Sequence, residues 1–306
     1  MVRLWPVPGP STVVLAWAAT VLGGEVTADR GLREGGSPWL IRTAGRSAVL
    51  RVAPTENAAN VMTEATAMRH AAAAGLPVPE VLGHDDGTAT GFALMLTSEV
   101  SGSSRIPAEP DARRLRALAA AAARISAVDV APSAALPVRS GPIGDVDWAG
   151  LRREHGASAM LLRAEESVNR AEPADDHVAF VHGDLWHGNT LWDGTELTAI
   201  LDWDAAGVGA AGIDLGSLRC DAALCYGTAA SAEVLAGWED EAGRPACDVP
   251  YWDAVAALAT PPDMGWVQPA IADQGRPDLS RELLTERREA FLDQALSQLG
   301  GEGSAV

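Results

Sequence analysis

The segment from Val181 to Asn189 contains the residue types that phosphoryl transfer requires. It reads Val-His-Gly-Asp-Leu-Trp-His-Gly-Asn, with an acid at Asp184 and an amide at Asn189. Because a transferred phosphoryl group carries diffuse negative charge, a protein that moves it supplies Mg²⁺ ligands and one carboxylate to orient and deprotonate the attacking hydroxyl. In the spacing His-x-Asp-x-x-x-x-Asn, the Asp serves as this base and the Asn binds metal. We therefore expect Asp184 to be the catalytic base and Asn189 to be a metal ligand.

The residues after this loop predict a hairpin that brings a second acid back to it. Leu191-Trp192 is typical of a short strand, Asp193-Gly194 is a strong two-residue hairpin signal, and residues 197–201 are typical of the returning strand. Asp202 follows this apolar strand directly. The sequence therefore predicts that Asp202 lies beside Asp184 as the second metal ligand.

Two other interpretations of this segment compete with the first. A short pattern can arise by chance, although chance explains poorly the hairpin and the apolar strand that ends in Asp202. His182 and His187 could instead bind zinc together with Asp184, since imidazole and carboxylate groups suit that metal. We favour a role in which His182 packs inside the protein and holds the shape of the loop by hydrogen bonding.

At these residues the chain resembles the aminoglycoside phosphotransferase and choline kinase-like family, the small-molecule branch of the protein-kinase-like fold. Residues 182–189 resemble the family's HGDxxxxN catalytic motif, and Leu201-Asp202-Trp203-Asp204 resembles its metal-binding motif. Residues 207–215 are similar to its G-x-G-x-x-x-x-D-L segment, in which Asp214 would begin a helix and brace the catalytic loop. Asp214 is also an ordinary N-terminal helix acid that the helix dipole favours, and the two roles are compatible.

The composition is that of a globular protein with a strongly acidic surface. The 306 residues are 47% hydrophobic and 21% charged, which is enough to build the core of two lobes or of one large domain. Acidic residues outnumber basic ones by 41 to 23, the formal net charge is −18, and lysine is absent, so every Lys or Arg position is arginine. Binding to nucleic acid or to an anionic membrane needs a basic surface, so neither partner is expected. A small-molecule acceptor, including a cationic one, is compatible with this charge.

The sequence carries no signal for secretion or for membrane insertion. Residues 1–10 lack the basic and apolar regions of a signal peptide, and the apolar stretch 13–22 is too short to span a bilayer. We therefore expect a cytoplasmic protein. Cys220, Cys225 and Cys247 form no CxxC pair, so we expect small buried apolar residues and neither a disulfide framework nor structural zinc.

The N-terminal third of the sequence predicts a five-stranded sheet with helices. Helical patterns cover residues 12–22 and 56–74, and the second ends at a glycine followed by a proline. Strands are expected at residues 25–28, 38–43, 46–52, 78–82 and 91–96, with a turn at 85–87.

A glycine-rich turn between the first two strands is a candidate phosphate-binding loop. Residues 31–37 lie where the chain of a kinase closes over the nucleotide phosphates, which makes Gly35, Gly36 and Ser37 candidate nucleotide contacts. The turn is not GxGxxG, and a plain hairpin loop has the same pattern.

One basic residue stands inside an apolar strand. Arg51 interrupts the strand 48–52 at the position where protein kinases carry a Lys that pairs with the phosphates and with a helix Glu. A planar guanidinium can hold two phosphate oxygens at once. Glu64 lies in the middle of the following helix and is the expected partner of Arg51. In the alternative interpretation, Arg51 and Glu64 both lie on the protein surface and do not pair.

Residues 98–102 are predicted to link two lobes. In the family that the chain resembles, main-chain groups of this linker bond the purine edge, which makes Ser98 and Val100 candidate nucleotide contacts. Beyond the linker, helical patterns cover residues 110–128, 148–170, 215–226, 229–241, 250–258 and 280–299.

The predicted fold is therefore α+β and two-lobed, of the protein-kinase-like kind. Residues 1–97 form a nucleotide-binding lobe with a five-stranded antiparallel sheet and a helix. Residues 103–306 form a mainly helical lobe that carries the catalytic hairpins and binds the acceptor.

Acidic and aromatic residues between positions 238 and 266 are candidate acceptor contacts. The acids are Glu239, Asp240, Glu241, Asp248, Asp253 and Asp263, and Tyr251 and Trp252 lie among them. Such a mixture would suit an amine-bearing or ring-shaped acceptor. A solvated acidic face with ordinary core tryptophans is the favoured alternative.

These features predict an ATP- or GTP-dependent phosphotransferase that uses Mg²⁺ and modifies a hydroxyl of a small-molecule antibiotic, such as an aminoglycoside or a nucleoside, to confer resistance. A metabolic kinase for a ketosamine, amino sugar or amino alcohol is the alternative, because Trp186 also occurs at this place in ketosamine kinases. A protein kinase is disfavoured because neither D-F-G nor A-P-E follows the catalytic loop. A non-catalytic pseudokinase is disfavoured because Asp184, Asn189 and Asp202 are all present.

Overall fold

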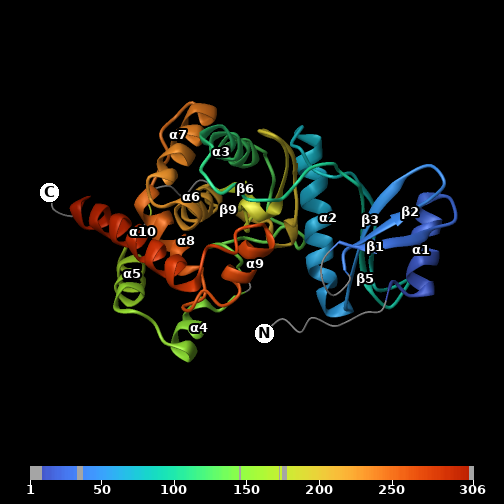
Figure 1. Cartoon of the computed structure of the whole chain (residues 1–306), viewed down its shortest axis with the longest axis horizontal. Helices are drawn as coiled ribbons and strands as arrows, with labels where there is room; N and C mark the ends of the chain where they lie inside the picture. The colour runs from blue at the N-terminus through green and yellow to red at the C-terminus, as the bar shows by residue number, and fades with distance from the viewer. Residues whose placement is uncertain (1–8, 33–36, 145, 172, 174–177, 303–306) are drawn as a thin grey trace.

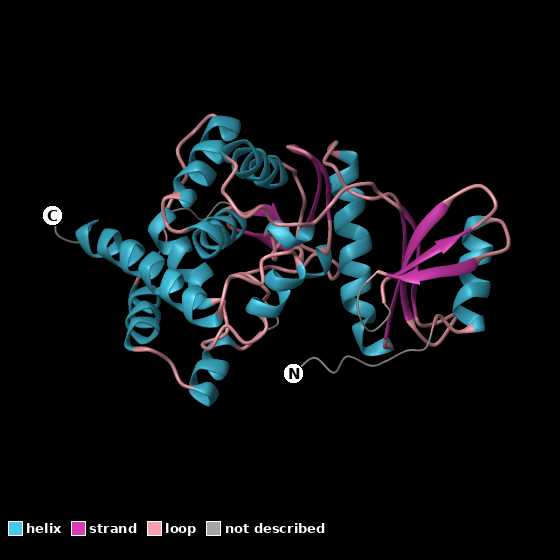
Figure 2. Cartoon of the chain, in the orientation of Figure 1, coloured by secondary structure: helices cyan, strands magenta, loops and turns pink. Residues whose placement is uncertain are grey.

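The structure, a computed structural model, describes residues 9–32, 37–144, 146–171, 173 and 178–302. A sheet dominates its N-terminal part and helices dominate its C-terminal part (Figures 1 and 2). The strands are β1 (Thr27–Gly31), β2 (Trp39–Arg42), β3 (Ser47–Ala53), β4 (Val81–Asp86), β5 (Ala93–Ser98), β6 (Ala179–Val181), β7 (Thr190–Asp193), β8 (Glu196–Ile200) and β9 (Gly207–Gly209). The α-helices are α1 (Thr12–Leu22), α2 (Ala58–Ala73), α3 (Ala112–Ser126), α4 (Trp148–His155), α5 (Ala159–Arg170), α6 (Gly212–Tyr226), α7 (Ala230–Ala242), α8 (Val249–Leu258), α9 (Val267–Asp273) and α10 (Arg281–Glu302). Short 3₁₀ helices are η1 (Thr55–Asn57), η2 (His187–Asn189) and η3 (Trp203–Ala205).

The N-terminal sheet has five antiparallel strands, as the sequence predicts, and the structure gives their order as β1-β2-β3-β5-β4. Helices α1 and α2 pack on its two faces (Figure 1). Strand β5 contacts both helices, because its successive side chains point to opposite faces of the sheet. Leu94 and Leu96 pack with α1, whereas Ala93 and Met95 pack with α2. Arg51 of β3 lies opposite Met95 in the register. Arg51 therefore projects from the α2 face of the sheet.

Strand β4 begins later in the sequence than its pattern predicts. The expected strand was residues 78–82 with a turn at 85–87, but the pairing runs from Val81 to Asp86. Pro77 and Pro79 lack the amide hydrogen that a paired strand donates, which explains the late start. The buried Asp85 carboxylate accepts hydrogen bonds from the amides of Ala89 and Thr90, at 3.2 and 3.0 Å, and so fixes the turn after the strand.

Helix α6 is the centre of the helical part. One side of α6, including Leu215 and Leu218, packs in a cluster with α3 and α7, and the other side, including Leu224, packs with α5, α8 and α10. A buried pair joins α6 to α8, because Nε and Nη2 of Arg219 each donate to the Asp253 carboxylate at 2.8 Å. Helix α6 is therefore held on both sides, which matters because it carries residues of the site.

Other parts of the chain also differ from the prediction. The helix predicted at 148–170 is two helices, because the chain turns at Gly156, with φ +82°, and Ser158 begins α5 by accepting a hydrogen bond from the Leu161 amide. Helix α9 and the antiparallel pair β6–β9 are additional elements. Cys220 and Cys225 are buried as expected, but Cys247 is exposed.

Within the described residues no helix is both long and apolar enough to traverse a bilayer.

The contact of α6 with α8 leaves no room for a side chain at Gly216. A Cβ atom there would lie 2.4 Å from the carbonyl oxygen of Trp252. We expect Gly216→Ala to lower the free energy of unfolding by about 1–3 kcal/mol, because overpacking forces the helices apart. Gly24→Ala is the control, since a Cβ atom at Gly24 meets nothing within 4 Å. Urea unfolding followed by circular dichroism measures both variants. Equal stability of the two variants would show that α6 and α8 separate without cost.

Candidate active site

The predicted catalytic loop and hairpin are present. The loop begins after β6, passes through η2 and enters the antiparallel hairpin β7–β8. Asp202 follows the hairpin in a left-handed conformation, with φ +64° and ψ +57°, which is uncommon for a residue other than glycine. The Leu201 amide donates to the Asn189 carbonyl at 2.8 Å. This bond holds the residue before Asp202 against the end of the catalytic loop.

Asn189 and Asp184 are in direct contact. The Asn189 side-chain amide donates to the main-chain carbonyl of Asp184 at 2.9 Å and to its carboxylate at 3.1 Å. Burial, together with the nearby Asp202 and Asp204 carboxylates, raises the pKa of Asp184 well above its usual range, against the hydrogen bond from Asn189, which lowers it. A carboxylate with a raised pKa is a stronger proton acceptor than an exposed aspartate.

His182 holds the loop from inside the protein. Its side chain is fully buried, Nε2 donates to the Leu201 carbonyl at 2.9 Å, and Nδ1 accepts from the Asp184 amide at 3.3 Å. The ring also packs on Trp203, with centroids 4.5 Å apart. Burial lowers the pKa of His182 to about 4, so the ring is neutral near pH 7. Both ring nitrogens of His182 are already engaged in hydrogen bonds, which counts against the interpretation in which His182 binds zinc.

Asp214 braces the start of the same loop. Its buried carboxylate accepts hydrogen bonds from the amides of His182 and Gly183, at 2.7 and 2.9 Å, from the first turn of α6. Burial raises the pKa of Asp214 to about 6, and the two amide donors act in the opposite direction. Gly183 has φ +81°, and a Cβ atom there would lie 2.3 Å from the Ala205 carbonyl oxygen. The loop therefore needs glycine at this position and an acceptor at Asp214.

Arg51 joins the sheet to the residues after the hairpin. Its Nη2 donates to Glu64 at 3.0 Å and to the Asp202 carboxylate, and its Nη1 lies 3.7 Å from Asp204. Burial alone would lower the pKa of Arg51, but the three carboxylates raise it. Burial raises the pKa of Glu64 to about 7, although Arg51 lowers it. The expected Arg51–Glu64 pair is therefore present, and Asp202 and Asp204 complete the cluster.

The residues expected in the loop and linker have specific positions. The Ser37 hydroxyl donates to the Val52 carbonyl at 3.2 Å and accepts from the Val52 amide at 3.0 Å, so Ser37 itself is bonded to β3. Ser98 lies at the end of β5, where its amide donates to the Glu80 carbonyl at 2.9 Å. Val100 lines the cleft described below. Gly35 and Gly36 lie outside the described residues.

The segment after β5 is bonded to the catalytic hairpin. Ser103 exchanges two backbone hydrogen bonds with Trp192, at 2.9 and 3.0 Å. The Thr198 hydroxyl also donates to the Ser101 carbonyl at 2.9 Å. The end of this segment therefore moves with the hairpin and not with the sheet.

A second acid on α6 escaped the sequence analysis. Asp221 is buried and accepts hydrogen bonds from the His187 amide at 2.9 Å and from the His187 ring. Asp214 and Asp221 lie about two helical turns apart, so both face the loop from one side of α6. This spacing was visible in the sequence, but only the tertiary contact shows which residue Asp221 meets.

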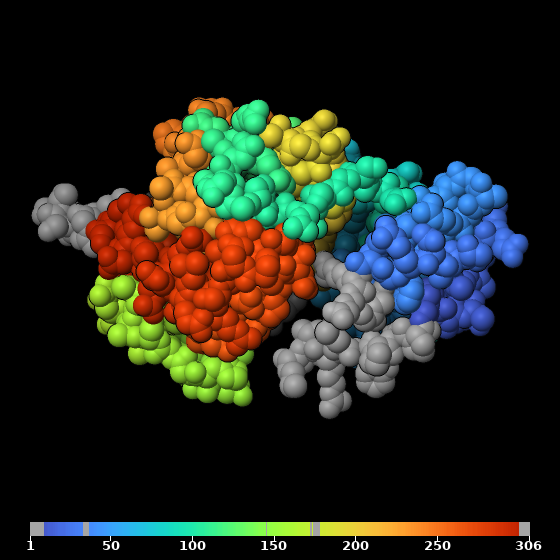
Figure 3. All heavy atoms as spheres, in the orientation of Figure 1, coloured from blue at the N-terminus to red at the C-terminus, as the bar shows by residue number. Residues whose placement is uncertain are grey.

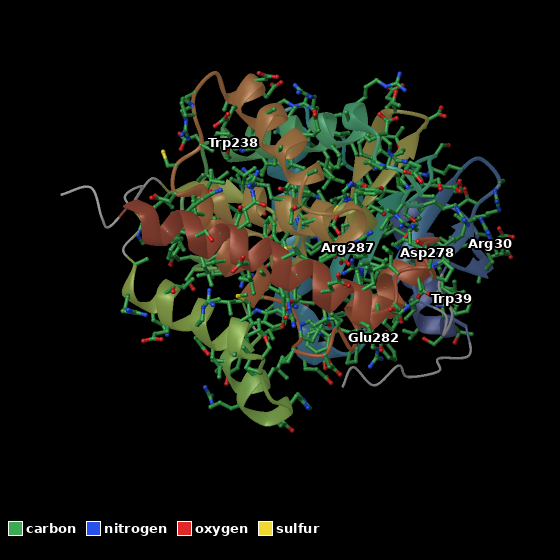
Figure 4. The ribbon with its side chains drawn as sticks, turned by 60° about the vertical axis from the view of Figure 1, so that its left-hand side comes forward. Arg30, Trp39, Trp238, Asp278, Glu282 and Arg287 are labelled. Carbon is green, nitrogen blue, oxygen red and sulfur yellow. The ribbon has the colours of Figure 1, made fainter. Side chains whose placement is uncertain are left out.

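A single cleft of about 1000 Å³ brings these residues together. Asp184, Asn189 and Asp202 line it, the sheet contributes Arg30 and Val49, and the helical part contributes residues from α4, α6, α8 and α9. In the space-filling view of Figure 3, the atoms of the N-terminal sheet region (blue) lie on the right and those of the C-terminal helical region (red) lie on the left. Arg30 lies among the strands near Trp39, and Trp238 lies in the helical part (Figure 4).

The acids between positions 238 and 266 do not line this cleft. Asp253 pairs with Arg219, and Asp240 lies 3.0 Å from Arg116. Asp263 accepts from the Gly265 amide at 2.9 Å. For these three acids the structure favours the alternative in which the acids support the fold or face solvent.

Comparison with known proteins agrees with this geometry. The model of the phosphotransferase enzyme family matches residues 30–258, and the chain belongs to this family. The enzyme class predicted from the sequence, a phosphotransferase acting on small-molecule hydroxyl groups, is thereby confirmed. No curated protein sequence matches the chain significantly.

Solved structures with a similar fold include proteins described as phosphotransferases of antibiotics. A Ralstonia eutropha protein assigned to the aminoglycoside phosphotransferases is 16% identical with a TM-score of 0.64, over 92% of this chain and 98% of that one. Macrolide 2'-phosphotransferase MphH from Brachybacterium faecium is 20% identical with a TM-score of 0.60, over 88% and 96%. A thermostable mutant of aminoglycoside phosphotransferase APH(4)-Ia, in ternary complex with ADP and hygromycin B, is 18% identical with a TM-score of 0.59, over 92% and 98%. At these identities the likeness concerns the fold, and the predicted α+β kinase-like fold is confirmed. The division at residues 97 and 102 stays a prediction.

The burial of neutral His182 predicts a pH-dependent stability. Between its unfolded pKa of 6.5 and its folded pKa of about 4, the unfolded chain binds a proton that the folded chain excludes. The free energy of unfolding therefore falls as the pH drops through this window, by roughly 2 kcal/mol between pH 7 and pH 5. We expect His182→Gln to lose this part of the pH dependence, as measured by urea unfolding at both pH values. His155→Gln, at an exposed position, is the control and keeps it. The same slope in all three proteins would contradict a buried neutral His182.

Proposed function

We propose that this chain transfers the γ-phosphoryl group of ATP or GTP to a hydroxyl of a small-molecule antibiotic and so inactivates it. The observation that carries the proposal is that Asp184, Asn189 and Asp202 line one cleft between the sheet and the helices, and that Arg51 of the sheet donates a hydrogen bond to Asp202. These residues supply a base, metal ligands and a phosphate-binding cation, which are the parts that phosphoryl transfer needs.

Asp184 acts as the base. Its carboxylate lies in the cleft, is oriented by Asn189, and has a raised pKa because of burial and of the neighbouring acids. It accepts a hydrogen bond from the acceptor hydroxyl and turns the oxygen toward the γ-phosphorus. As the new phosphorus–oxygen bond forms, the bond from the γ-phosphorus to the β–γ bridging oxygen breaks, the nucleoside diphosphate leaves, and Asp184 takes the proton of the hydroxyl.

Asn189 and Asp202 hold Mg²⁺. Asn189 directs its side-chain NH₂ at Asp184, which leaves its carbonyl oxygen as the end that can bind metal. Burial raises the pKa values of Asp184 and Glu64, and the Asp202 and Asp204 carboxylates raise them further, so negative charge gathers here that a divalent cation would neutralise. Asn189 and Asp202 would hold the ion together with oxygens of the donor phosphates and water, and its charge would neutralise the negative charge of the transferred group.

Arg51 binds the phosphates from the sheet side of the cleft. Glu64 fixes the guanidinium from α2, and Asp202 and Asp204 hold it toward the catalytic loop. The donor base then lies along the segment after β5. The Ser98 amide is already used within the sheet, so Val100 is the better candidate for a main-chain bond to the purine.

A metabolic small-molecule kinase is the second candidate. It is favoured by Trp186, which also occurs at this place in ketosamine kinases and whose ring here lies against Gly188 and lines the cleft. The two candidates share the chemistry of transfer and differ only in the acceptor.

Asp184→Asn tests the catalytic assignment. We expect kcat to fall by about 10²–10⁴-fold with little change in nucleotide KM, because only orientation and deprotonation of the hydroxyl are lost. Asp193→Asn is the control, since Asp193 is exposed at the hairpin turn, and Asn-Gly keeps the turn. ADP release is measured over a panel of antibiotics, and the same proteins are expressed in a sensitive bacterium. Resistance that survives in Asp184→Asn would remove Asp184 from the mechanism. Turnover of amino sugars in place of all antibiotics would favour the metabolic kinase.

Arg51→Lys tests the role of the guanidinium. One ammonium cannot reproduce contacts that two Arg51 nitrogens divide among Glu64, Asp202 and Asp204. We expect a raised nucleotide KM with a smaller fall in kcat, the pattern of lost ground-state binding. Arg42→Lys, in an exposed ion pair on β2, is the control. Full activity in Arg51→Lys would mean that charge alone suffices, and full activity in Arg51→Ala would assign the phosphate contact to another residue.

A further inference from the structure

The helical side of the cleft is mainly apolar. Its aromatic residues are Trp148, Trp186 and Trp266. The cleft is also lined by aliphatic residues of this side, namely Ile143, Leu224, Ala256, Ala259, Val267 and Ala270. The acceptor hydroxyl must reach Asp184 from this side, because the sheet side is assigned to the nucleotide.

Trp148 and Trp266 form one aromatic wall. Their ring centroids are 5.8 Å apart and the rings are tilted by 35°. The Trp148 indole nitrogen donates to the Pro142 carbonyl at 3.3 Å, so its polar group is already bonded. Trp266 is 47% exposed, which is unusual for so large an apolar side chain. This tryptophan wall therefore presents apolar surface that a ligand in the cleft would cover.

Trp186 continues the apolar surface to the reaction centre. Its six-membered ring lies over Gly188, where a Cβ atom would come within 2.6 Å of three ring carbons. Gly188 lies in the same loop as Asp184 and Asn189. An acceptor that rests on the wall therefore also meets an aromatic face next to the catalytic carboxylate.

A buried arginine fixes the Trp266 end of the wall. Arg288 of α10 is 1% exposed and donates to the carbonyls of Pro261 and Pro262, at 2.9 and 3.0 Å. Arg281 donates to the Gly265 carbonyl at 3.1 Å. The loop that leads into Trp266 is thus tied to α10, and the wall is preorganised.

A second buried arginine fixes the Trp148 end. Arg152 of α4 donates to the Leu258 carbonyl at the end of α8, at 2.7 Å, and to Glu165 of α5, at 2.9 Å. Helix α4, which begins at Trp148, is therefore attached to two neighbouring helices. Rigid aromatic surface costs little entropy when a ligand binds to it.

Carboxylates are few on this side of the cleft. Apart from the catalytic Asp184 and Asp202, the described lining residues there include two acids, Asp221 and Asp273. Asp221 already accepts two hydrogen bonds from His187. Asp273 is exposed at the end of α9. An acceptor with several ammonium groups would lose hydration here without gaining a counter-charge for each of them.

We propose that the acceptor is a lipophilic ring system that carries the reactive hydroxyl and no more than one amine, and that it lies on Trp148 and Trp266. This assignment rests on the proposed function. The wall supplies apolar burial and stacking, and a single ammonium group can be met by Asp273 or by the face of a tryptophan. The net charge of −18 attracts cations at long range, but the surface that touches the acceptor sets its class.

The experiment compares two kinds of acceptor. The probes are erythromycin, a lipophilic macrocycle with one tertiary amine, and kanamycin, a polar sugar with several amines. Calorimetry measures acceptor binding, and ADP release measures transfer, for the unchanged chain and for Trp148→Ala and Trp266→Ala. Leu162→Ala is the matched control, because Leu162 is an exposed apolar residue on α5 that does not line the cleft.

We expect erythromycin to bind more tightly than kanamycin. Each tryptophan variant should weaken erythromycin binding about tenfold or more, whereas Leu162→Ala should leave it unchanged. Trp266→Phe should recover part of the loss, which a merely structural role would not predict. Circular dichroism confirms that the variants are folded.

Binding and turnover separate the two proposals. Erythromycin binding that depends on Trp266, without ADP release, would support the acceptor class and count against phosphoryl transfer. Turnover of kanamycin with a KM that is unchanged in both tryptophan variants would support transfer and overturn the acceptor class. Absence of erythromycin binding to the unchanged chain would also overturn it.

Discussion

The buried Asp214 carboxylate is the interaction on which the rest of the site depends. It satisfies the amides of His182 and Gly183 where the chain leaves β6. A buried amide without an acceptor costs about 1–3 kcal/mol, so the loop would not keep this path without Asp214. Because α6 is packed on both sides, the acid itself has a fixed position. The packing of the helical core fixes Asp214, and Asp214 in turn fixes the loop that carries Asp184.

The sheet is connected to this framework by charge. Arg51 projects from the face of the sheet on which α2 packs. Its partners Asp202 and Asp204 come directly after the hairpin β7–β8 in the sequence. The Ile200 amide also donates to the Pro77 carbonyl at 2.7 Å, just after α2. The phosphate side and the hydroxyl side of the cleft thus share one network, in which moving Arg51 would also move the residues assigned to Mg²⁺.

The features that the sequence predicts best are those that depend on residues close together along the chain. The loop and the hairpin follow from spacing along the chain, so it could be predicted without a structure that Asp184, Asn189 and Asp202 come together, whereas their catalytic and metal-binding roles stay predictions. The break at Gly156 and the three-residue strands β6 and β9 carry too little pattern to be seen. The contact of Asp221 with His187 and the bonds of the Ser37 hydroxyl depend on tertiary structure, which spacing does not encode.

The bonds between the segment after β5 and the hairpin also limit how the cleft can open. From Ser101 onward the segment is attached to the hairpin, and up to Ser98 it belongs to the sheet. Only Glu99 and Val100 remain to absorb a change of backbone angle in this connection. A rotation of the sheet would therefore pivot at the place where the purine is proposed to bind. Nucleotide exchange and domain motion would share one hinge, so an occupied hinge would resist opening until the nucleotide leaves.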